Sequence, residues 1–114
     1  METTPSLNPN IIIEASGGDS SIVQELVDLF LAQIPLDLHD LGSAIEKEDL
    51  DNIKKLAHKI KGSSAYFGAE YMVLCAKKIE EFALKKDLTS CKNHFQRLQE
   101  AYHKVTQAIP STFL

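Results

Sequence analysis

The sequence predicts an all-α protein of five helices that pack as an up-down antiparallel bundle. Apolar residues recur three and four positions apart over most of the chain from residue 20, which is typical of helices that bury one face. No stretch alternates apolar and polar residues between turn signals, as a half-buried strand would. The segments between the periodic stretches are short, and short connections make consecutive helices antiparallel neighbours.

Residues 1–18 are predicted to be a leader, followed by a helical bundle over 19–109. Pro5 and Pro9 disfavour regular structure in the leader. Three consecutive isoleucines, residues 11–13, could pin it against the core.

The first two helices are predicted on either side of Pro35. Asp19 or Ser20 can accept hydrogen bonds from the first turn of a helix over 20–34. Pro35 is expected to end this helix and to begin a second one, over 35–48. The expected apolar stripes are Ile22, Leu26, Leu29 and Phe30 on the first helix, and Leu38, Leu41 and Ile45 on the second.

Three further helices complete the prediction. The third begins near Asp49 or Asp51, and Gly68 is placed to end it in the left-handed conformation. The fourth covers roughly 69–86, and the fifth runs from Asp87 or Thr89 to about Ile109. Pro110 is expected to stop the fifth helix, which leaves 110–114 as a tail. The inward residues are Met72, Ala76, Ile79 and Ala83 on the fourth helix, and Phe95, Leu98, Tyr102 and Val105 on the fifth.

Length and composition describe one ordinary soluble domain. The chain has 114 residues, 44% of them apolar and 25% charged. Cys75 and Cys91 form no paired framework and no CxxC, so they are expected to be buried reduced thiols. Neither a secretory signal nor a membrane-length apolar run is visible. We therefore expect a cytoplasmic protein, and the initial Met suggests a free-standing one.

His58 and Gly62 are predicted to share the exposed face of the third helix. At about 100° per residue, Ile53, Leu56, Ala57, Ile60 and Ser64 gather on one side. His58 falls near 140° from that side and Gly62 near 180°. Glycine in an exposed helix costs about 1 kcal/mol relative to alanine. Its presence favours a surface that another molecule approaches, although a tolerated weak position would look the same in one sequence.

The surroundings of His58 favour phosphoryl chemistry. Neutral imidazole has a nucleophilic nitrogen. Lysines within about a turn would attract a phosphoryl group and offset its charge; these are Lys54, Lys55, Lys59 and Lys61.

At these residues the chain resembles the histidine-containing phosphotransfer (HPt) domains. The family pattern H-x-x-K-G-[S/A]-[S/A]-x-x-x-G-[A/L] is matched at every position, by His58, Lys61, Gly62, Ser63, Ser64, Gly68 and Ala69. The segment GGDSSIVQELVDLFLAQIP also looks like the first helix that is common in the family. The resemblance covers about residues 16–108. It implies an up-down antiparallel four-helix bundle with an additional N-terminal helix, five helices in total.

The resemblance implies a role for each of these residues. His58 would carry the phosphoryl group on its outer ring nitrogen, and Lys61 would help to hold it. Gly62 would leave room for the rim of a receiver domain, and Ser63 is a lesser candidate for a contact with the phosphoryl group. Where several members have a glutamine that binds the inner ring nitrogen, this chain has Glu80. That carboxylate could orient the imidazole, or it could be a surface charge paired with a lysine.

The implied partners are the receiver domains of a hybrid sensor histidine kinase and of a response regulator. Mg²⁺ is expected on the receiver, and no cofactor or metal of the chain's own. No ATP-binding element is visible, so the chain is expected to be a phosphotransfer protein and not an enzyme that phosphorylates itself. The alternative is a helical adaptor that binds a receiver or kinase without transfer.

Charge and spacing argue against other functions. Residues 1–51 carry a net charge of −10 and residues 52–114 one of +6. This asymmetry hints at an acidic partner, although helices that face each other or water would also produce it. The net acidity and the absence of aromatics within KKLAHKIK argue against nucleic acid, and the histidines and cysteines lack metal-ligand spacing. No exposed apolar heptad is evident, so a monomer is expected.

Overall fold

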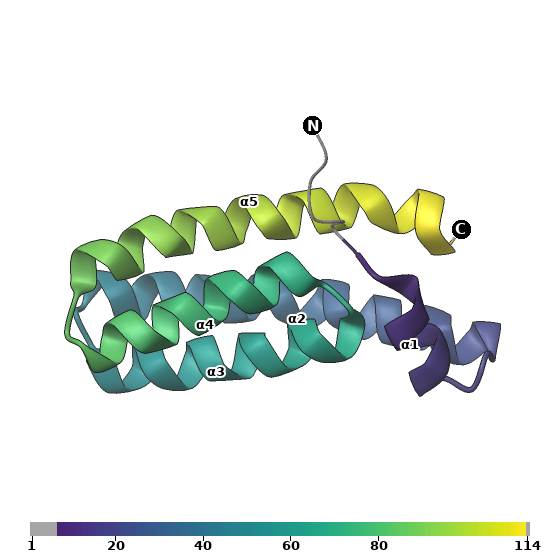
Figure 1. The fold of residues 1–114 in the computed structure, drawn as a ribbon, viewed down its shortest axis with the longest axis horizontal. Coiled ribbons are helices and arrows are strands. Elements are labelled where there is room, and N and C mark those ends of the chain that lie inside the picture. The colour runs from purple at the N-terminus through teal and green to yellow at the C-terminus, as the bar shows by residue number, and fades with distance from the viewer. Residues whose placement is uncertain (1–6, 114) are drawn as a thin grey trace.

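The computed structural model describes residues 7–113, without the side chains of residues 111 and 112. Within that range the chain is helical, contains no strand and has five helices, the number predicted, although the bounds of the first two differ from the prediction. None of the helices described is long and apolar enough to cross a membrane. The helices are α1 (Pro9–Ala15), α2 (Ser20–Glu46), α3 (Leu50–Phe67), α4 (Glu70–Leu84) and α5 (Leu88–Phe113), as Figure 1 shows.

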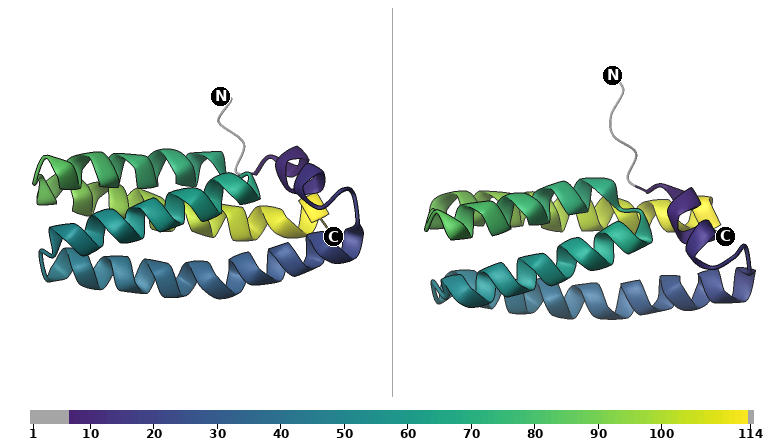
Figure 2. Two further views of the ribbon diagram at one scale, coloured as in Figure 1. Left: turned by 90° about the horizontal axis from the view of Figure 1, so that it is seen from below. Right: turned by 60° about the horizontal axis from the view of Figure 1, so that its bottom comes forward.

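The four long helices, α2 to α5, form an antiparallel bundle, and α1 lies across one end of it (Figures 1 and 2). The most extensive contacts join α3 to α4, α4 to α5, and α2 to α3. The helix α3 therefore lies between α2 and α4, which matters because α3 carries His58.

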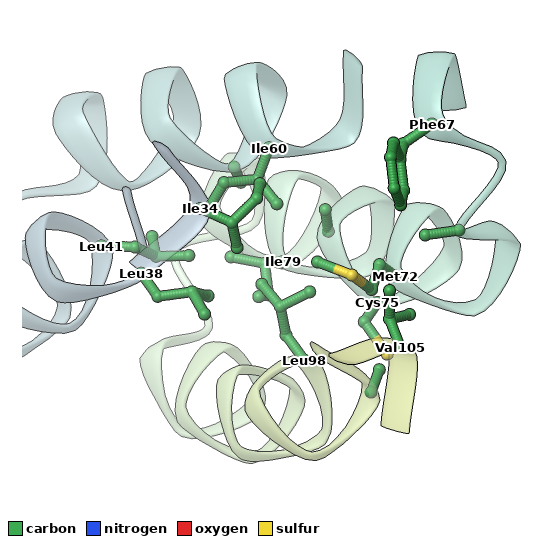
Figure 3. Packing of buried hydrophobic residues seen from close by; sticks show 14 of the residues in the cluster. Ile34, Leu38, Leu41, Ile60, Phe67, Met72, Cys75, Ile79, Leu98 and Val105 are labelled. Carbon is green, nitrogen blue, oxygen red and sulfur yellow. The ribbon is translucent and has the colours of Figure 1, made fainter. Parts of the chain in front are cut away.

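The core is built from one apolar face of each long helix. Figure 3 shows these side chains pointing toward one another between the helices. Most of the predicted inward residues of 35–105 are buried, although Leu56, Phe95 and Tyr102 are only partly covered. The side chains labelled in the figure are Ile34, Leu38 and Leu41 from α2, Ile60 and Phe67 from α3, Met72, Cys75 and Ile79 from α4, and Leu98 and Val105 from α5.

The prediction that Pro35 separates two helices is wrong. α2 runs without a break from Ser20 to Glu46, with Pro35 inside it. An internal proline removes one helical hydrogen bond and costs about 3 kcal/mol. Buried residues on both sides of Pro35, such as Ile34 and Leu38, pack into the same core and hold the two halves in line. Pro35 itself is on the exposed side, where water can bind the carbonyl group that the ring leaves unpaired.

Pro110 does not stop the last helix either, because α5 continues to Phe113. The Phe113 ring lies 6.0 Å from that of Phe67, which stacks on Phe30 with a centroid distance of 4.0 Å. A proline this close to a helix end removes only one hydrogen bond, and the aromatic contact holds the last turn in place.

Part of the predicted leader is a helix that packs on the bundle. Asn8 caps α1 through its side chain, which accepts a hydrogen bond from the backbone N–H of Asn10 at 3.1 Å. Pro9 then occupies the first turn, where a missing N–H does little harm. Of the three isoleucines only Ile12 is buried, at 0% exposure, so it does pin this segment to the core. The division into leader, bundle and tail stays a prediction, and residues 1–6 lie outside the part described.

The helix ends follow the predicted capping residues. Asp19 accepts hydrogen bonds from the backbone of Ser21 and Ile22, and Asp49 accepts one from that of Asn52. Gly68 ends α3 with φ +83°, a conformation that suits glycine. Its carbonyl group also accepts a hydrogen bond from the Asn8 backbone at 2.8 Å.

We expect Gly68→Ala to destabilise the fold more than Gly17→Ala does. Both positions have positive φ, but an added Cβ at Gly68 would lie 2.4 Å from the Asn8 carbonyl oxygen, whereas one at Gly17 would meet nothing within 4 Å. The left-handed conformation alone costs about 1–3 kcal/mol for a residue other than glycine, and only Gly68→Ala must also displace the backbone. Urea unfolding compares the two variants. Equal losses would show that the contact with Asn8 does not constrain this turn.

Candidate functional site

His58 lies on the exposed face of α3 and leans toward α4. Its side chain is 69% exposed, and its Nδ1 lies 3.0 Å from Oε2 of Glu80. These residues are 22 positions apart, and the antiparallel packing of α3 on α4 brings them together. The ring is thus held through one nitrogen while most of its surface faces water.

Glu80 is bound at both carboxylate oxygens. Lys61 donates to Oε1 at 2.7 Å, and His58 lies against Oε2. Burial opposes ionisation of this carboxyl group, but the hydrogen bonds from Lys61 and His58 outweigh it and lower the pKa of Glu80 below its usual value. Glu80 is therefore ionised near neutral pH, and its negative charge faces both the imidazole and the ammonium group.

Gly62 lies one turn beyond His58, is exposed, and has open space around it. A Cβ added there would meet nothing within 4 Å. Within the part of the chain that the structure describes, no packing contact thus explains a glycine at this position. It leaves the backbone of α3 accessible beside His58.

The other predicted cations do not all surround His58. Lys59 leans toward α2, where its ammonium group lies 3.0 Å from Oδ1 of Asp37. Asp37 is 1% exposed and also accepts a hydrogen bond from Gln33 at 3.0 Å. Lys55 is exposed and lines a cleft between α2 and α3 with Lys59, whereas Lys54 is partly buried. Of the four lysines, Lys61 is thus the one that contacts the His58–Glu80 pair.

Ser63 also faces away from His58, into an apolar groove between α2 and α3. The groove has a volume of about 250 Å³. Ser63 makes no contact with the His58–Glu80 pair among the described residues, although its assignment to the phosphate environment stays a prediction. The groove is lined by Leu26, Leu29, Phe30, Gln33, Ile34, Ser63, Tyr66 and Phe67.

An exposed apolar stripe runs along α2 beside this groove. Part of this stripe was predicted from the sequence to face the core. Ile22, Leu29 and Leu36 are spaced by seven residues and are 39%, 64% and 60% exposed. Tyr66 on α3 is 54% exposed next to Leu29. The premise that no apolar heptad is exposed, on which a monomer was expected, is therefore wrong. The signal was present, since 20–34 has more apolar positions than one helix face can bury.

The Hpt domain family matches residues 25–108. The chain is 26% identical over 102 residues to the phosphorelay intermediate protein rdeA of Dictyostelium discoideum, and the match covers 90% of this chain and 40% of rdeA. The chain therefore spans well under half the length of that curated relative.

A solved structure has the same fold. The crystal structure of histidine-containing phosphotransfer protein B (HptB) from Pseudomonas aeruginosa PAO1 aligns with a TM-score of 0.89. The alignment covers 97% of this chain and 96% of HptB at 20% sequence identity. This likeness confirms the predicted bundle with its additional helix.

We expect Gly62→Ala to stabilise the protein by about 1 kcal/mol, because alanine is the better helix former and its methyl group would meet no described atom within 4 Å beyond its own stretch of helix. Gly42→Ala is the matched control. It makes the same change inside α2, but its Cβ would lie 3.0 Å from the Phe95 ring, so a smaller gain or a loss is expected. Thermal unfolding measures both, and a loss of stability in Gly62→Ala would contradict the open surroundings of Gly62.

Proposed function

The chain belongs to the Hpt domain family, and on that premise we propose that it is a phosphorelay intermediate. His58 accepts a phosphoryl group from one receiver domain, that of a hybrid sensor kinase, and passes it to the aspartate of another, on a response regulator. The observation that carries this proposal is the 69% exposed imidazole anchored at Nδ1 by Glu80, because it leaves Nε2 as the nitrogen for attack.

In this function the protein is a carrier and not an ATP-dependent kinase. The receiver supplies the phosphoryl group, the Mg²⁺ ion and the acidic pocket that surrounds its aspartate. Lys61 binds the same carboxylate as the imidazole, so its ammonium group can offset the charge of a phosphoryl group on the ring. The remaining lysines of α3 (Lys54, Lys55 and Lys59) add positive potential that speeds the approach of an acidic partner. We place this exchange in the cytoplasm.

We further propose that the receiver covers the face formed by α2 and α3. The exposed stripe of Ile22, Leu29 and Leu36, with the groove beside it, offers apolar surface next to the helix that carries His58. An exposed apolar patch of this kind marks an interaction site. Gly62 then lies where the two backbones come closest, so Gly62→Ala should slow transfer even though it stabilises the fold.

The alternative function is an adaptor that binds receivers without accepting phosphate. It uses the same apolar face and gives His58 no chemical role. A phosphorelay intermediate accepts a labelled phosphoryl group from a receiver, whereas an adaptor does not. A substitution of His58 tests this difference.

We expect a phosphorylated receiver to label the wild-type protein and the His103→Gln variant, but not His58→Gln. His103 is an exposed histidine on α5, so it controls for the substitution itself. The label should survive base and be lost in acid, as a phosphoramidate is. Circular dichroism confirms that each variant is folded. Labelling of His58→Gln would refute the assignment, and a wild-type protein that binds receivers without being labelled would establish the adaptor.

We expect Leu29→Lys to weaken receiver binding about tenfold or more, because burying a leucine contributes roughly 1.5–3 kcal/mol. Leu74→Lys is the control, since Leu74 is 52% exposed but lies on α4, which is diagonal to α2. Calorimetry measures the affinities, and sedimentation velocity reports the oligomeric state. If the two variants bind the receiver with equal affinity, the apolar stripe is not part of the docking surface. If the wild type is a dimer and only Leu29→Lys dissociates it, the stripe is a surface for self-association.

A further inference from the structure

A buried ion pair joins α2 to α3 on the side of α3 that faces away from Glu80. Asp37 on α2 is 1% exposed. Its Oδ1 accepts a hydrogen bond from the ammonium group of Lys59 on α3 and another from the side-chain amide of Gln33, both at 3.0 Å. Its Oδ2 is buried and has no hydrogen-bond partner among the described residues. Both donors therefore meet one oxygen, and half of the carboxylate is left unsatisfied.

This arrangement contributes little to stability. Taking a carboxylate out of water is costly unless its oxygens are bound, and a buried polar atom without a partner costs free energy. A buried ion pair also contributes little net stability on average. The fold thus gives little reason for a carboxylate at position 37. Lys59 is the charged group through which Asp37 can act at the surface.

Lys59 lies where a docked receiver would cover it. It follows His58 in the chain, and its side chain is 53% exposed. Gln33, the other residue bound to Asp37, lines the apolar groove between α2 and α3. A receiver that covers this groove and reaches His58 therefore also covers Lys59. An ammonium group has three donors and Asp37 occupies one of them, so donors remain for a partner.

Resting on the function proposed above, we propose that Asp37 is a positioning residue that holds the Lys59 ammonium group in place for an acidic side chain on the rim of the receiver. A mobile lysine loses rotamer freedom when an interface fixes it. Asp37 already fixes Lys59 in the unbound protein, so this loss does not weaken binding. A cation at a fixed point sets the register of the complex. It therefore favours a receiver whose acidic group lies at that point over one that is merely acidic.

Substitution of Asp37 separates positioning from electrostatic steering, because the two effects have opposite signs. Asp37→Asn keeps the shape of the side chain, releases Lys59 and makes the surface more positive. Asp40→Asn is the matched control: it removes the same charge from an exposed position three residues along α2, on the cleft that Lys59 lines. The probe is the receiver domain, from the same genome, that binds the wild type most tightly.

We expect Asp37→Asn to bind this receiver about fivefold more weakly than the wild type, the cost of immobilising one long side chain. Asp40→Asn should bind as tightly as the wild type or more tightly. In a Lys59→Met background, Asp37→Asn should change the affinity little, because no ammonium group remains to be held. Calorimetry measures the affinities. ¹⁵N NMR of the lysine ammonium groups should show Lys59 ordered in the wild type and mobile in Asp37→Asn, with Lys61 unchanged.

Three results would overturn the proposal. They are equal affinities of Asp37→Asn and Asp40→Asn, an equal loss from Asp37→Asn with and without Lys59, and an ordered Lys59 ammonium group in Asp37→Asn. Urea unfolding shows whether each variant is folded. If Asp37→Asn is not, Lys59→Gln is compared with Lys55→Gln, which removes a charge from an exposed lysine on the same cleft. Equal losses in that pair would also refute a specific contact at Lys59.

Binding and phosphoryl transfer are measured separately, so the two proposals can fail separately. A receiver that binds the wild type but does not label His58 counts against the proposed function, while the affinities still test Asp37. Normal labelling with no effect of Asp37→Asn on affinity counts against the role of Asp37 alone. A wild-type protein that binds no receiver contradicts both.

Discussion

The helices α3 and α4 share the most extensive contact of any helix pair in residues 7–113, and the candidate site depends on that packing. Small buried residues, such as Ala57 on α3 and Ala76 on α4, let two helices approach closely. The left-handed Gly68 makes the turn between them, and its carbonyl group binds the segment before α1. This arrangement places Glu80 within 3.0 Å of His58 across 22 residues.

The exposed side of α3 divides its polar contacts between two neighbouring helices. His58 and Lys61 reach α4 through Glu80, whereas Lys59 reaches α2 through the buried Asp37. Gly62 lies between these two sets of contacts, with open space above its backbone. The backbone at Gly62 is therefore exposed, with charged side chains on both sides. Such a surface suits the approach of another protein better than the binding of a small molecule.

Several features on the α2–α3 face lower stability or solubility, or contribute little to folding. Gly62 weakens the helix, Leu29 leaves apolar surface in water, and the pair of Asp37 with Lys59 takes a carboxylate out of water. A buried ion pair contributes little net stability on average, and exposed apolar patches favour association. Their concentration on the α2–α3 face fits a surface whose sequence is constrained by partner binding, because proteins accept such costs at functional sites.

Much of this protein was determined by local sequence signals. The helical periodicity, the caps at Asp19 and Asp49, the left-handed end at Gly68 and the shared exposed face of His58 and Gly62 all depend on residues within a turn or two of each other, so one sequence sufficed to predict them. The tertiary structure decided the rest. Packing on both sides of Pro35 kept α2 continuous, and Phe67 held the turn beyond Pro110. Which neighbour each side chain of α3 meets, Glu80 for Lys61 but Asp37 for Lys59, depends on which helices flank α3. The surplus of apolar residues in 20–34 indicated that some of them would be exposed, but not that Leu29 would be among them. An apolar side chain has the same helical spacing whether its face meets the core or a partner.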